Sequence, residues 1–167
     1  SMHSPMNSPT LPWSPTRWPV LRRYDAAHLA RIALPLGGIG TGTVSLGGRG
    51  ELRDWQIMNR PARGYSTVTK GNDAPFFALC VRQPDGTTQT KALIGPLDAS
   101  EYEHYEGRPV DHHGLPRFRD ARFEAAYPFG QVHLSDPALP VDVTVRGFNP
   151  LIPGDTDNSS LPVAVLS

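Results

Sequence analysis

Prolines and glycines interrupt this chain at short intervals along its whole length. The 167 residues include 18 Pro and 16 Gly, about a fifth of the total. Proline lacks an amide hydrogen, and both residues favour turns, so this spacing leaves little room for long helices. The chain is therefore expected to form short strands joined by turns, with at most two short helices.

The hydrophobic pattern supports strands. Residues 121–127 and 141–146 alternate apolar and polar side chains, which is typical of half-buried strands. The continuous apolar runs 76–81 and 161–166 predict strands that are covered on both sides. Further strands are expected at residues 41–46, 52–57 and 87–94 and around Val132, with turns at Pro84-Asp85-Gly86 and Pro128-Phe129-Gly130. Together these segments predict an all-β fold, most simply an antiparallel β-sandwich.

Two short segments carry helix signals. Asp25 is a suitable N-cap for a helix over residues 25–32, in which the spacing of alanines and Leu29 runs on to Ala33 before Pro35 ends it. The second expected helix covers residues 100–106, where Ser100 and Glu103 fit a capping box.

The chain is expected to have two parts. Residues 1–20 contain five prolines and predict a flexible N-terminal arm, of which Ser1 resembles the remainder of a cleaved tag. Residues 21–167 are expected to form part of a sandwich domain. The apolar run 161–166 stops one residue before the last residue of the sequence, which favours a fragment or a domain completed by another polypeptide.

Charge and cysteine content exclude several classes of function. Lys and Arg number 16 and Asp and Glu also 16, so no net charge attracts nucleic acid. No apolar run approaches the ~20 residues of a transmembrane helix, and the N-terminus lacks a secretory pattern, so we expect a cytoplasmic protein. Cys80 is the sole cysteine, which excludes an internal disulfide, and its place in the run 76–81 predicts a buried, inert thiol.

The glycine-rich segment 36–43 suggests a phosphate-binding loop but lacks the features that one requires. A strand pattern follows it instead of a helix, and it contains no Gly-Lys-Ser or Gly-Lys-Thr ending. We interpret these glycines as positions where the backbone turns tightly or approaches another segment closely.

The remaining polar clusters predict neither a metal site nor a cofactor. His104, His112 and His113 lie among acidic residues, but adjacent histidines on an extended chain point to opposite sides. Residues 155–158 lack the glycine and the distal glutamate of a calcium loop, and a turn with side chains capping backbone amides fits them better. No set of residues forms a convincing catalytic group, so we predict no catalytic residue, no metal and no cofactor in this chain.

Two blocks of sequence resemble a known family. The segment IALPLGGIGTGTVS at residues 32–45 is followed by GRGELRDWQI at 48–57, and FNPLIPGD at 148–155 is followed by SSLPVAV at 159–165. In order and spacing these blocks resemble the N-terminal domain of glycoside hydrolase family 116, the group of bile-acid β-glucosidases and non-lysosomal glucosylceramidases.

The resemblance implies a β-sandwich packed on a C-terminal (α/α)6 barrel in the same enzyme. It also implies retaining hydrolysis of β-glucosides by two carboxylates, typically ~5–5.5 Å apart, both in the barrel and so outside this chain. Leu46-Gly47-Gly48 and the Asp54 that precedes Trp55 depart from the animal enzymes, which favours a bacterial member that acts on soluble β-glucosides or other oligosaccharides.

Three residues are candidates for the rim of the substrate cleft. Trp55 is a possible platform for stacking a sugar ring, and Arg49 or Asp54 could bond sugar hydroxyls. Two alternatives remain open. The domain could be purely structural, fixing the loops of the barrel, or it could be a stand-alone carbohydrate-binding or scaffold module without catalysis.

Overall fold

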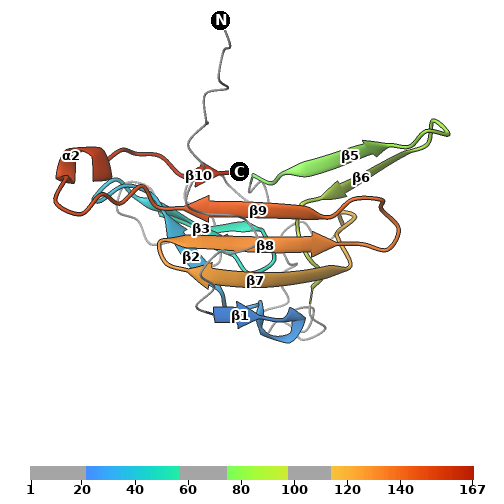
Figure 1. Ribbon diagram of the computed structural model, residues 1–167, viewed down its shortest axis with the longest axis horizontal. Helices are drawn as coiled ribbons and strands as arrows, with labels where there is room; N and C mark the ends of the chain where they lie inside the picture. Colours follow the sequence, from blue (N-terminus) through green and yellow to red (C-terminus); the bar gives the residue numbers. More distant parts are fainter. Residues whose placement is uncertain (1–21, 57–74, 98–113) are drawn as a thin grey trace, which may run out of the picture.

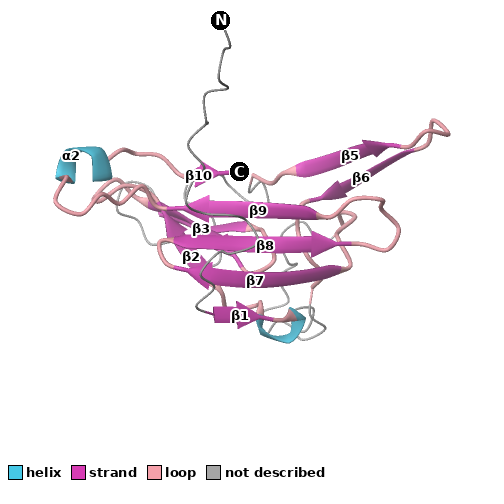
Figure 2. Cartoon of the chain, in the orientation of Figure 1, coloured by secondary structure: helices cyan, strands magenta, loops and turns pink. Residues whose placement is uncertain are grey.

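The computed structural model describes residues 22–56, 75–97 and 114–167. These residues form short strands with two helical turns (Figure 2), so the predicted all-β fold is confirmed. In chain order the elements are β1 (Arg22–Tyr24), η2 (Ala26–His28), β2 (Ala33–Leu36), β3 (Thr43–Gly47), β4 (Leu52–Gln56), β5 (Ala78–Arg82), β6 (Thr88–Ala92), β7 (Asp120–Ala126), β8 (Phe129–Ser135), β9 (Val143–Phe148), α2 (Thr156–Ser159) and β10 (Val165–Leu166).

The strands form two stacked sheets and a separate hairpin. The larger sheet has five antiparallel strands in the order β1-β7-β8-β9-β10, and the smaller has three in the order β2-β3-β4. Figure 1 shows the five-stranded sheet in front of β2 and β3. Strands β5 and β6 form a two-stranded sheet of their own, which extends away from the sandwich at the upper right of Figure 1, and the last residue of β6, Ala92, also forms a single bridge to Arg117.

The hydrophobic core lies between the two sheets. Phe123, Val132 and Leu134 from the five-stranded sheet and Leu36 and Leu46 from the three-stranded sheet are each no more than 2% exposed. Full burial of such a side chain contributes about 1.5–3 kcal/mol. The alternating pattern of residues 121–127 correctly placed Ala121 and Phe123 of β7 in the core, but Ala126 is buried and Tyr127 is exposed, against the pattern.

The apolar run 76–81 is not covered on both sides, and that prediction is wrong. Phe76 and Phe77 are 42% and 46% exposed, and the side chains of β5 alternate between exposed and half-buried. Cys80 is exposed, so the prediction of a buried thiol is also wrong. The reason is that β5 belongs to a two-stranded hairpin, which has one face turned to the body and one to solvent.

Two other predicted elements are shorter than expected. The strand expected at 161–166 is confined to β10, since Pro162 has no amide hydrogen to pair, and Leu161 and Val163 are 49% and 43% exposed. The predicted cap Asp25 accepts a hydrogen bond from the amide of Ala27, but η2 ends at His28. Ala33 lies in β2, where pairing with β3 replaces the expected helix.

Several predictions concern residues outside the described ranges. These are the arm 1–20, the helix 100–106 and the histidines His104, His112 and His113. Within the described ranges, His, Cys, Asp and Glu side chains form no group of three that could hold a metal ion. The helices of the same ranges are too short and too polar to cross a membrane.

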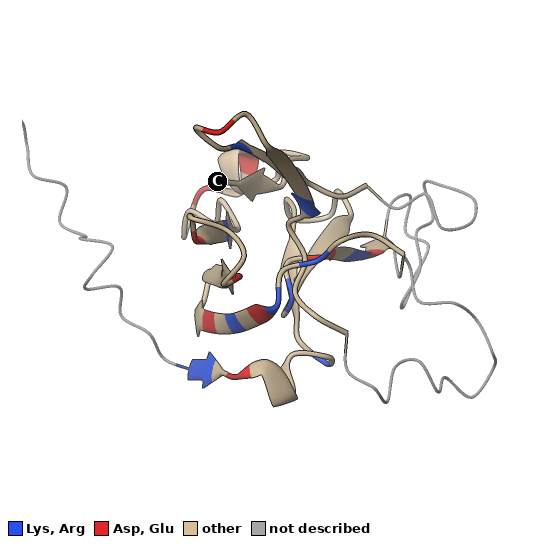
Figure 3. Ribbon diagram, turned by 90° about the vertical axis from the view of Figure 1, so that its right-hand side faces the viewer, with Lys and Arg blue, Asp and Glu red and all other residues tan. Residues whose placement is uncertain are grey.

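The outer face of the five-stranded sheet carries a polar network. Acidic and basic residues alternate along β7 (Figure 3), and the carboxylate of Glu124 is its centre. Glu124 Oε2 accepts from Gln131 Nε2 at 2.7 Å and lies 3.0 Å from His133 Nε2, while Oε1 lies 3.2 Å from Arg23 Nε. Burial on its own raises the pKa of Glu124, but the hydrogen bonds from His133 and Gln131 outweigh it and lower that pKa.

The network gives the fold a measurable pH dependence. A carboxyl group whose pKa is lowered on folding stabilises the fold when it is ionised. We therefore expect Glu124 to stabilise the fold at pH values above the ordinary glutamate pKa of ~4.3, and this stabilisation to be lost as the pH falls below that value. Urea unfolding of the wild type and of Glu124→Gln should therefore converge in acid, while Asp120→Asn, exposed on the same strand, should behave like the wild type. A difference between wild type and Glu124→Gln that does not change with pH would contradict this assignment.

Candidate functional site

The glycine-rich segment forms the loop that joins β2 to β3. Gly37, Gly40 and Gly42 have φ angles of 149°, 74° and 100°, which other residues rarely adopt. The loop leads directly into β3, so it lacks the helix that a dinucleotide-binding loop requires. The interpretation of these glycines as positions of tight turning is confirmed.

Gly38 also brings two distant segments into contact. A Cβ atom at Gly38 would lie 2.2 Å from the carbonyl oxygen of Leu161, so only glycine fits. The amide of Ile39 donates to the carbonyl of Ser159 at 3.0 Å. The loop 37–42 is therefore fastened to residues 159–161, more than a hundred positions further along the chain.

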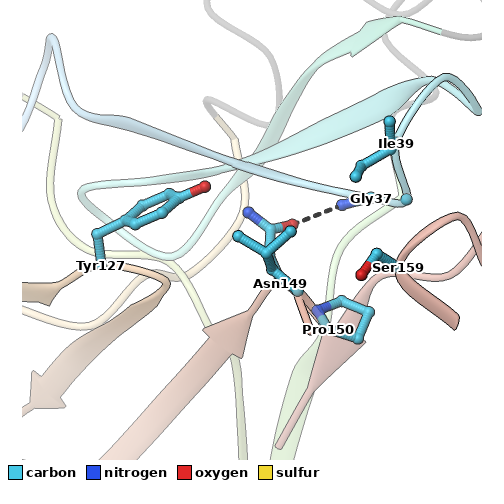
Figure 4. A pocket seen from close by; sticks show the side chains of 8 residues that line it. Gly37, Ile39, Tyr127, Asn149, Pro150 and Ser159 are labelled. Carbon is cyan, nitrogen blue, oxygen red and sulfur yellow. Dashed lines mark hydrogen bonds between the residues drawn. The ribbon is translucent and has the colours of Figure 1, made fainter. Parts of the chain in front are cut away.

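Asn149 fastens the same loop from the other side. Its Oδ1 accepts a hydrogen bond from the amide of Gly37 at 2.9 Å (Figure 4), and its Nδ2 donates to the carbonyl of Pro35 at 2.7 Å. One side chain thus satisfies a donor and an acceptor on the end of β2 and the start of the loop. We call the loop 37–42 together with residues 149–152 and 159–161 the Asn149 corner.

Ser159 and the short helix α2 complete the Asn149 corner. The hydroxyl of Ser159 accepts from the amide of Ile152 at 2.9 Å and donates to the carbonyl of the same residue at 3.1 Å. Asp155 caps α2 by accepting from the amide of Asn158, and the hydrogen bonds from Asn158 lower the pKa of Asp155. The predicted capping turn at residues 155–158 is confirmed.

A small pocket opens at the Asn149 corner. It has a volume of about 100 Å³ and is lined by Gly37, Gly38, Ile39, Tyr127, Asn149, Pro150, Leu151 and Ser159. Figure 4 shows Tyr127 opposite Ile39, with Asn149 between them. Tyr127 is 67% exposed and Ile39 is 55% exposed, so large apolar groups border the opening.

The three predicted rim residues do not lie together. Arg49 occupies the turn between β3 and β4, is 5% exposed, and its carbonyl accepts from the amide of Gly95 at 2.8 Å. Trp55 lies near the far end of β4, next to Gln56, which pairs with Thr43 at the start of β3. Trp55 and the loop 37–42 are therefore at one end of the smaller sheet and Arg49 is at the other.

A bulge in β4 determines where Trp55 points. The register between β3 and β4 shifts between Thr43 and Ser45, and Asp54 has a φ of 52°. Bulges re-aim side chains, and here Trp55 packs against the core, with its Nε1 donating to the carbonyl of Leu52 at 3.3 Å. Asp54 Oδ2 lies 3.1 Å from Arg53 Nε in an ion pair.

Glu51 is a titratable residue of this turn that the sequence analysis did not single out. Its Oε2 accepts from the amide of Arg49 at 3.1 Å, and its carboxylate covers Gly47, where a Cβ atom would lie 2.3 Å from Cδ. Burial raises the pKa of Glu51, against the opposing effects of its hydrogen bonds and of Arg49 and Arg53. The glutamate thus closes the turn between β3 and β4.

Comparison with known families decides what kind of domain this is. Residues 33–167 match the family model described as beta-glucosidase 2, glycosyl-hydrolase family 116 N-term. The chain belongs to this family. The match spans both blocks of the resemblance noted in the sequence, which is thereby confirmed.

In this family 116 N-terminal domain the two blocks of the resemblance meet in space. The loop 37–42 comes from the first block, and Asn149 and Ser159 from the second. The sequence analysis quoted both blocks but assigned Asn149 and Ser159 no role. Their partners in the loop 37–42 lie more than a hundred residues earlier in the chain, so the sequence alone did not indicate this contact.

The backbone at Asp54 yields a direct test of the bulge. Asp54→Gly and Asp54→Ala both remove the ion pair with Arg53, but only alanine retains the steric cost of a positive φ. Asp54→Gly is therefore expected to be more stable than Asp54→Ala by about 1 kcal/mol in urea unfolding. Equal stability of the two variants would show that the bulge relaxes when Asp54 is replaced.

Proposed function

We propose that this domain is the N-terminal β-sandwich of a retaining β-glycosidase that hydrolyses β-glucosides. The observation that carries the proposal is the family match over residues 33–167, whose description names a β-glucosidase. In this proposal residues 21–167 form part of the sandwich, residues 1–20 form an arm, and a C-terminal (α/α)6 barrel of the same enzyme holds both catalytic carboxylates.

Three carboxylates of the described residues, those of Glu51, Glu124 and Asp136, have structural roles in this domain. Glu124 is bound by Gln131 and His133, and Asp136, which is 3% exposed, forms an ion pair with Lys91 that joins β6 to the end of β8. Glu51 closes a turn. Retaining hydrolysis needs two carboxylates ~5–5.5 Å apart facing one cleft, and each of these three is already engaged by neighbours within the domain.

Activity measurements test the assignment of the chemistry. The chain of 167 residues is expected to show no turnover of an aryl β-glucoside, whereas the enzyme that joins it to the catalytic domain should hydrolyse the substrate with retention of configuration. Turnover by the chain alone would refute the placement of the catalytic pair in the barrel. Inversion of configuration by the joined enzyme would refute the retaining mechanism.

Within this proposal Trp55 and Asp54 are the residues that reach the rim of the substrate cleft. Both lie in the bulge at the end of β4 that adjoins the loop 37–42, and bulges are frequent next to active sites. The burial of Arg49 at the other end of β4 favours a role in the turn, so we assign Arg49 to the support of the sheet.

Substitutions of Trp55 separate sugar stacking from core packing. Trp55→Leu keeps an apolar side chain against the core but removes the aromatic face, and Trp55→Phe keeps both. In the joined enzyme Trp55→Leu is expected to raise KM for a β-glucoside about fivefold, since stacking contributes about 1 kcal/mol, while Trp55→Phe retains most of the affinity. A lower Tm with unchanged KM in Trp55→Leu would assign Trp55 to the core alone.

We further propose a bacterial enzyme that works in the cytoplasm on soluble β-glucosides. The exposed thiol of Cys80 is compatible with a reducing compartment. Fractionation of cells that express the tagged enzyme would test the location, and recovery in the periplasm or the medium would contradict it.

A further inference from the structure

Arg53 of β4 contacts two carboxylates and a backbone carbonyl. Its Nε lies 3.1 Å from Asp54 Oδ2, and its Nη1 donates to the carbonyl of Ala30 at 3.1 Å and lies 3.9 Å from Glu51 Oε1. The side chain of Arg53 is 31% exposed, so water screens these contacts only in part. Arg53 thus links the β3–β4 turn, the bulge in β4 and the segment that follows η2.

The carbonyl of Ala30 is a rigid anchor for Arg53. The residue before it, Leu29, is 1% exposed in the hydrophobic core, and its carbonyl accepts from the amide of Ile32 at 3.2 Å. A Cβ atom at Gly48 would lie 2.6 Å from the carbonyl oxygen of Leu29, so this segment packs directly on the β3–β4 turn. Arg53 therefore reaches the bulge from a point that the core holds in place.

The ion pair between Arg53 and Asp54 depends on the bulge. The side chains of consecutive residues in a regular strand point to opposite faces of the sheet, where they cannot meet. Asp54 instead has a φ of 52°, and its carboxylate contacts the side chain of the preceding residue. The ion pair therefore stabilises the bulged strand relative to a regular one and offsets part of the cost of the left-handed backbone.

The bulge also determines on which face of β4 Trp55 lies. Ser45 pairs with Arg53, and regular antiparallel pairing from there would place Trp55 opposite the residue two positions before Ser45. That residue, Thr43, pairs instead with the residue after Trp55. A shift of one residue moves side chains to the other face of a sheet. Accordingly Leu52 and Trp55 both pack against the core, although they are three positions apart.

We propose that Arg53 is a positioning residue of the substrate cleft: by holding β4 in the bulged register, it keeps Trp55 in the orientation that binds a β-glucoside. This proposal rests on the proposed function, in which Trp55 and Asp54 reach the rim of the cleft. Arg53 itself touches no substrate. It sets the fraction of molecules whose rim is competent, and the apparent affinity for the substrate falls in proportion to that fraction.

Substitution of Arg53 in the joined enzyme tests the proposal through KM. Arg53→Met removes the bonds to Asp54 and Ala30, and is expected to raise KM for an aryl β-glucoside about threefold at unchanged kcat, since it weakens binding in the ground state and the transition state alike. Arg53→Lys keeps the charge without the planar fork, so its KM should lie between those of the wild type and Arg53→Met.

The matched control for this substitution is Arg122→Met. Arg122 is exposed on β7, in the other sheet, and its replacement should leave KM unchanged. If Arg53→Met lowers the Tm of the joined enzyme but leaves KM at the value of the wild type, Arg53 has a structural role alone and the proposal is refuted.

A double-mutant cycle assigns the effect to the ion pair. Asp54→Gly removes the carboxylate, and glycine adopts a positive φ without strain, so the bulge no longer depends on Arg53. Adding Arg53→Met to Asp54→Gly should therefore leave KM close to that of Asp54→Gly alone. An equal rise of KM in both backgrounds would refute the coupling of Arg53 to the bulge.

The fluorescence of Trp55 gives a readout that needs no activity. In the chain of 167 residues, Trp13→Phe and Trp18→Phe leave Trp55 as the sole tryptophan. Because Trp55 packs against the core in the bulged register, Arg53→Met should raise its quenching constant for acrylamide about twofold, while Arg122→Met should not change it. Equal quenching in Arg53→Met and its parent would refute the proposal.

The outcomes separate this proposal from the proposed function. If the joined enzyme hydrolyses a β-glucoside but Arg53→Met changes neither KM nor quenching, the role of Arg53 is wrong and the function stands. If the joined enzyme cleaves no β-glucoside, the function is wrong, and the quenching of Trp55 decides whether Arg53 sets the register. Increased quenching with unchanged KM would refute the link between the register and substrate binding.

Discussion

Gly38→Ala is expected to lower the free energy of unfolding by about 3 kcal/mol or more. The added Cβ would lie 2.2 Å from the carbonyl oxygen of Leu161 and 2.7 Å from the carbonyl carbon of Ser160, both backbone atoms that cannot rotate away. Relief requires the loop 37–42 to separate from residues 159–161, which also breaks the hydrogen bond between Ile39 and Ser159. Urea unfolding monitored by tryptophan fluorescence measures the loss.

Two other glycines provide matched controls for this substitution. Gly40 has a φ of 74° but open space around it, so Gly40→Ala should cost only about 1 kcal/mol for the left-handed backbone. Gly114 has open space and no positive φ, so Gly114→Ala should be neutral or slightly stabilising. If Gly38→Ala were no worse than Gly40→Ala, close approach of the two segments would not be what requires glycine at position 38.

The strands that the sequence predicts well are those whose pattern has one interpretation. Residues 121–124 alternate apolar and polar side chains, and in a sheet with one buried face this indicates both the strand and the inward direction of Ala121 and Phe123. The turn Pro84-Asp85-Gly86 is similarly determined by local chemistry, since Gly86 has a φ of 86° and Asp85 accepts from the amide of Thr87. Such features depend on residues that are close in sequence, so the sequence predicts them.

The features that the sequence does not predict depend on distant partners. The run 76–81 is equally compatible with a central strand and with a peripheral hairpin, and only the sheet order places β5 in a hairpin and leaves Cys80 exposed. The separation of Arg49 from Trp55 follows from the length of β4 and the bulge at Asp54, and the residue types predict neither of these features. The role of Asn149 depends on Pro35 and Gly37, more than a hundred residues earlier.

Asn149→Ala is expected to lower the free energy of unfolding by about 2–4 kcal/mol. The substitution removes hydrogen bonds of 2.9 Å and 2.7 Å and leaves the half-buried amide of Gly37 without its acceptor. Asn158→Ala is the matched control: among the residues that the structure describes, its exposed side chain donates to Asp155 alone, and its backbone amide keeps the capping bond. The control should change stability by no more than about 0.5 kcal/mol.

Asn149→Asp tests the hydrogen bonds of residue 149 to Gly37 and Pro35 through the pH dependence of stability. An ionised carboxylate can still accept from the amide of Gly37 but repels the carbonyl of Pro35, whereas a protonated carboxyl can donate to that carbonyl. Folding therefore favours the protonated form and raises the pKa of this carboxyl, so the variant should be most stable in acid and lose stability as the pH rises through that pKa. Asn149→Ala should show no such recovery in acid. If neither variant regains stability in acid, and if Asn149→Ala has little effect at neutral pH, the hydrogen bonds of Asn149 do not hold the loop 37–42. The contacts of Gly38 and Ser159 would then hold it alone.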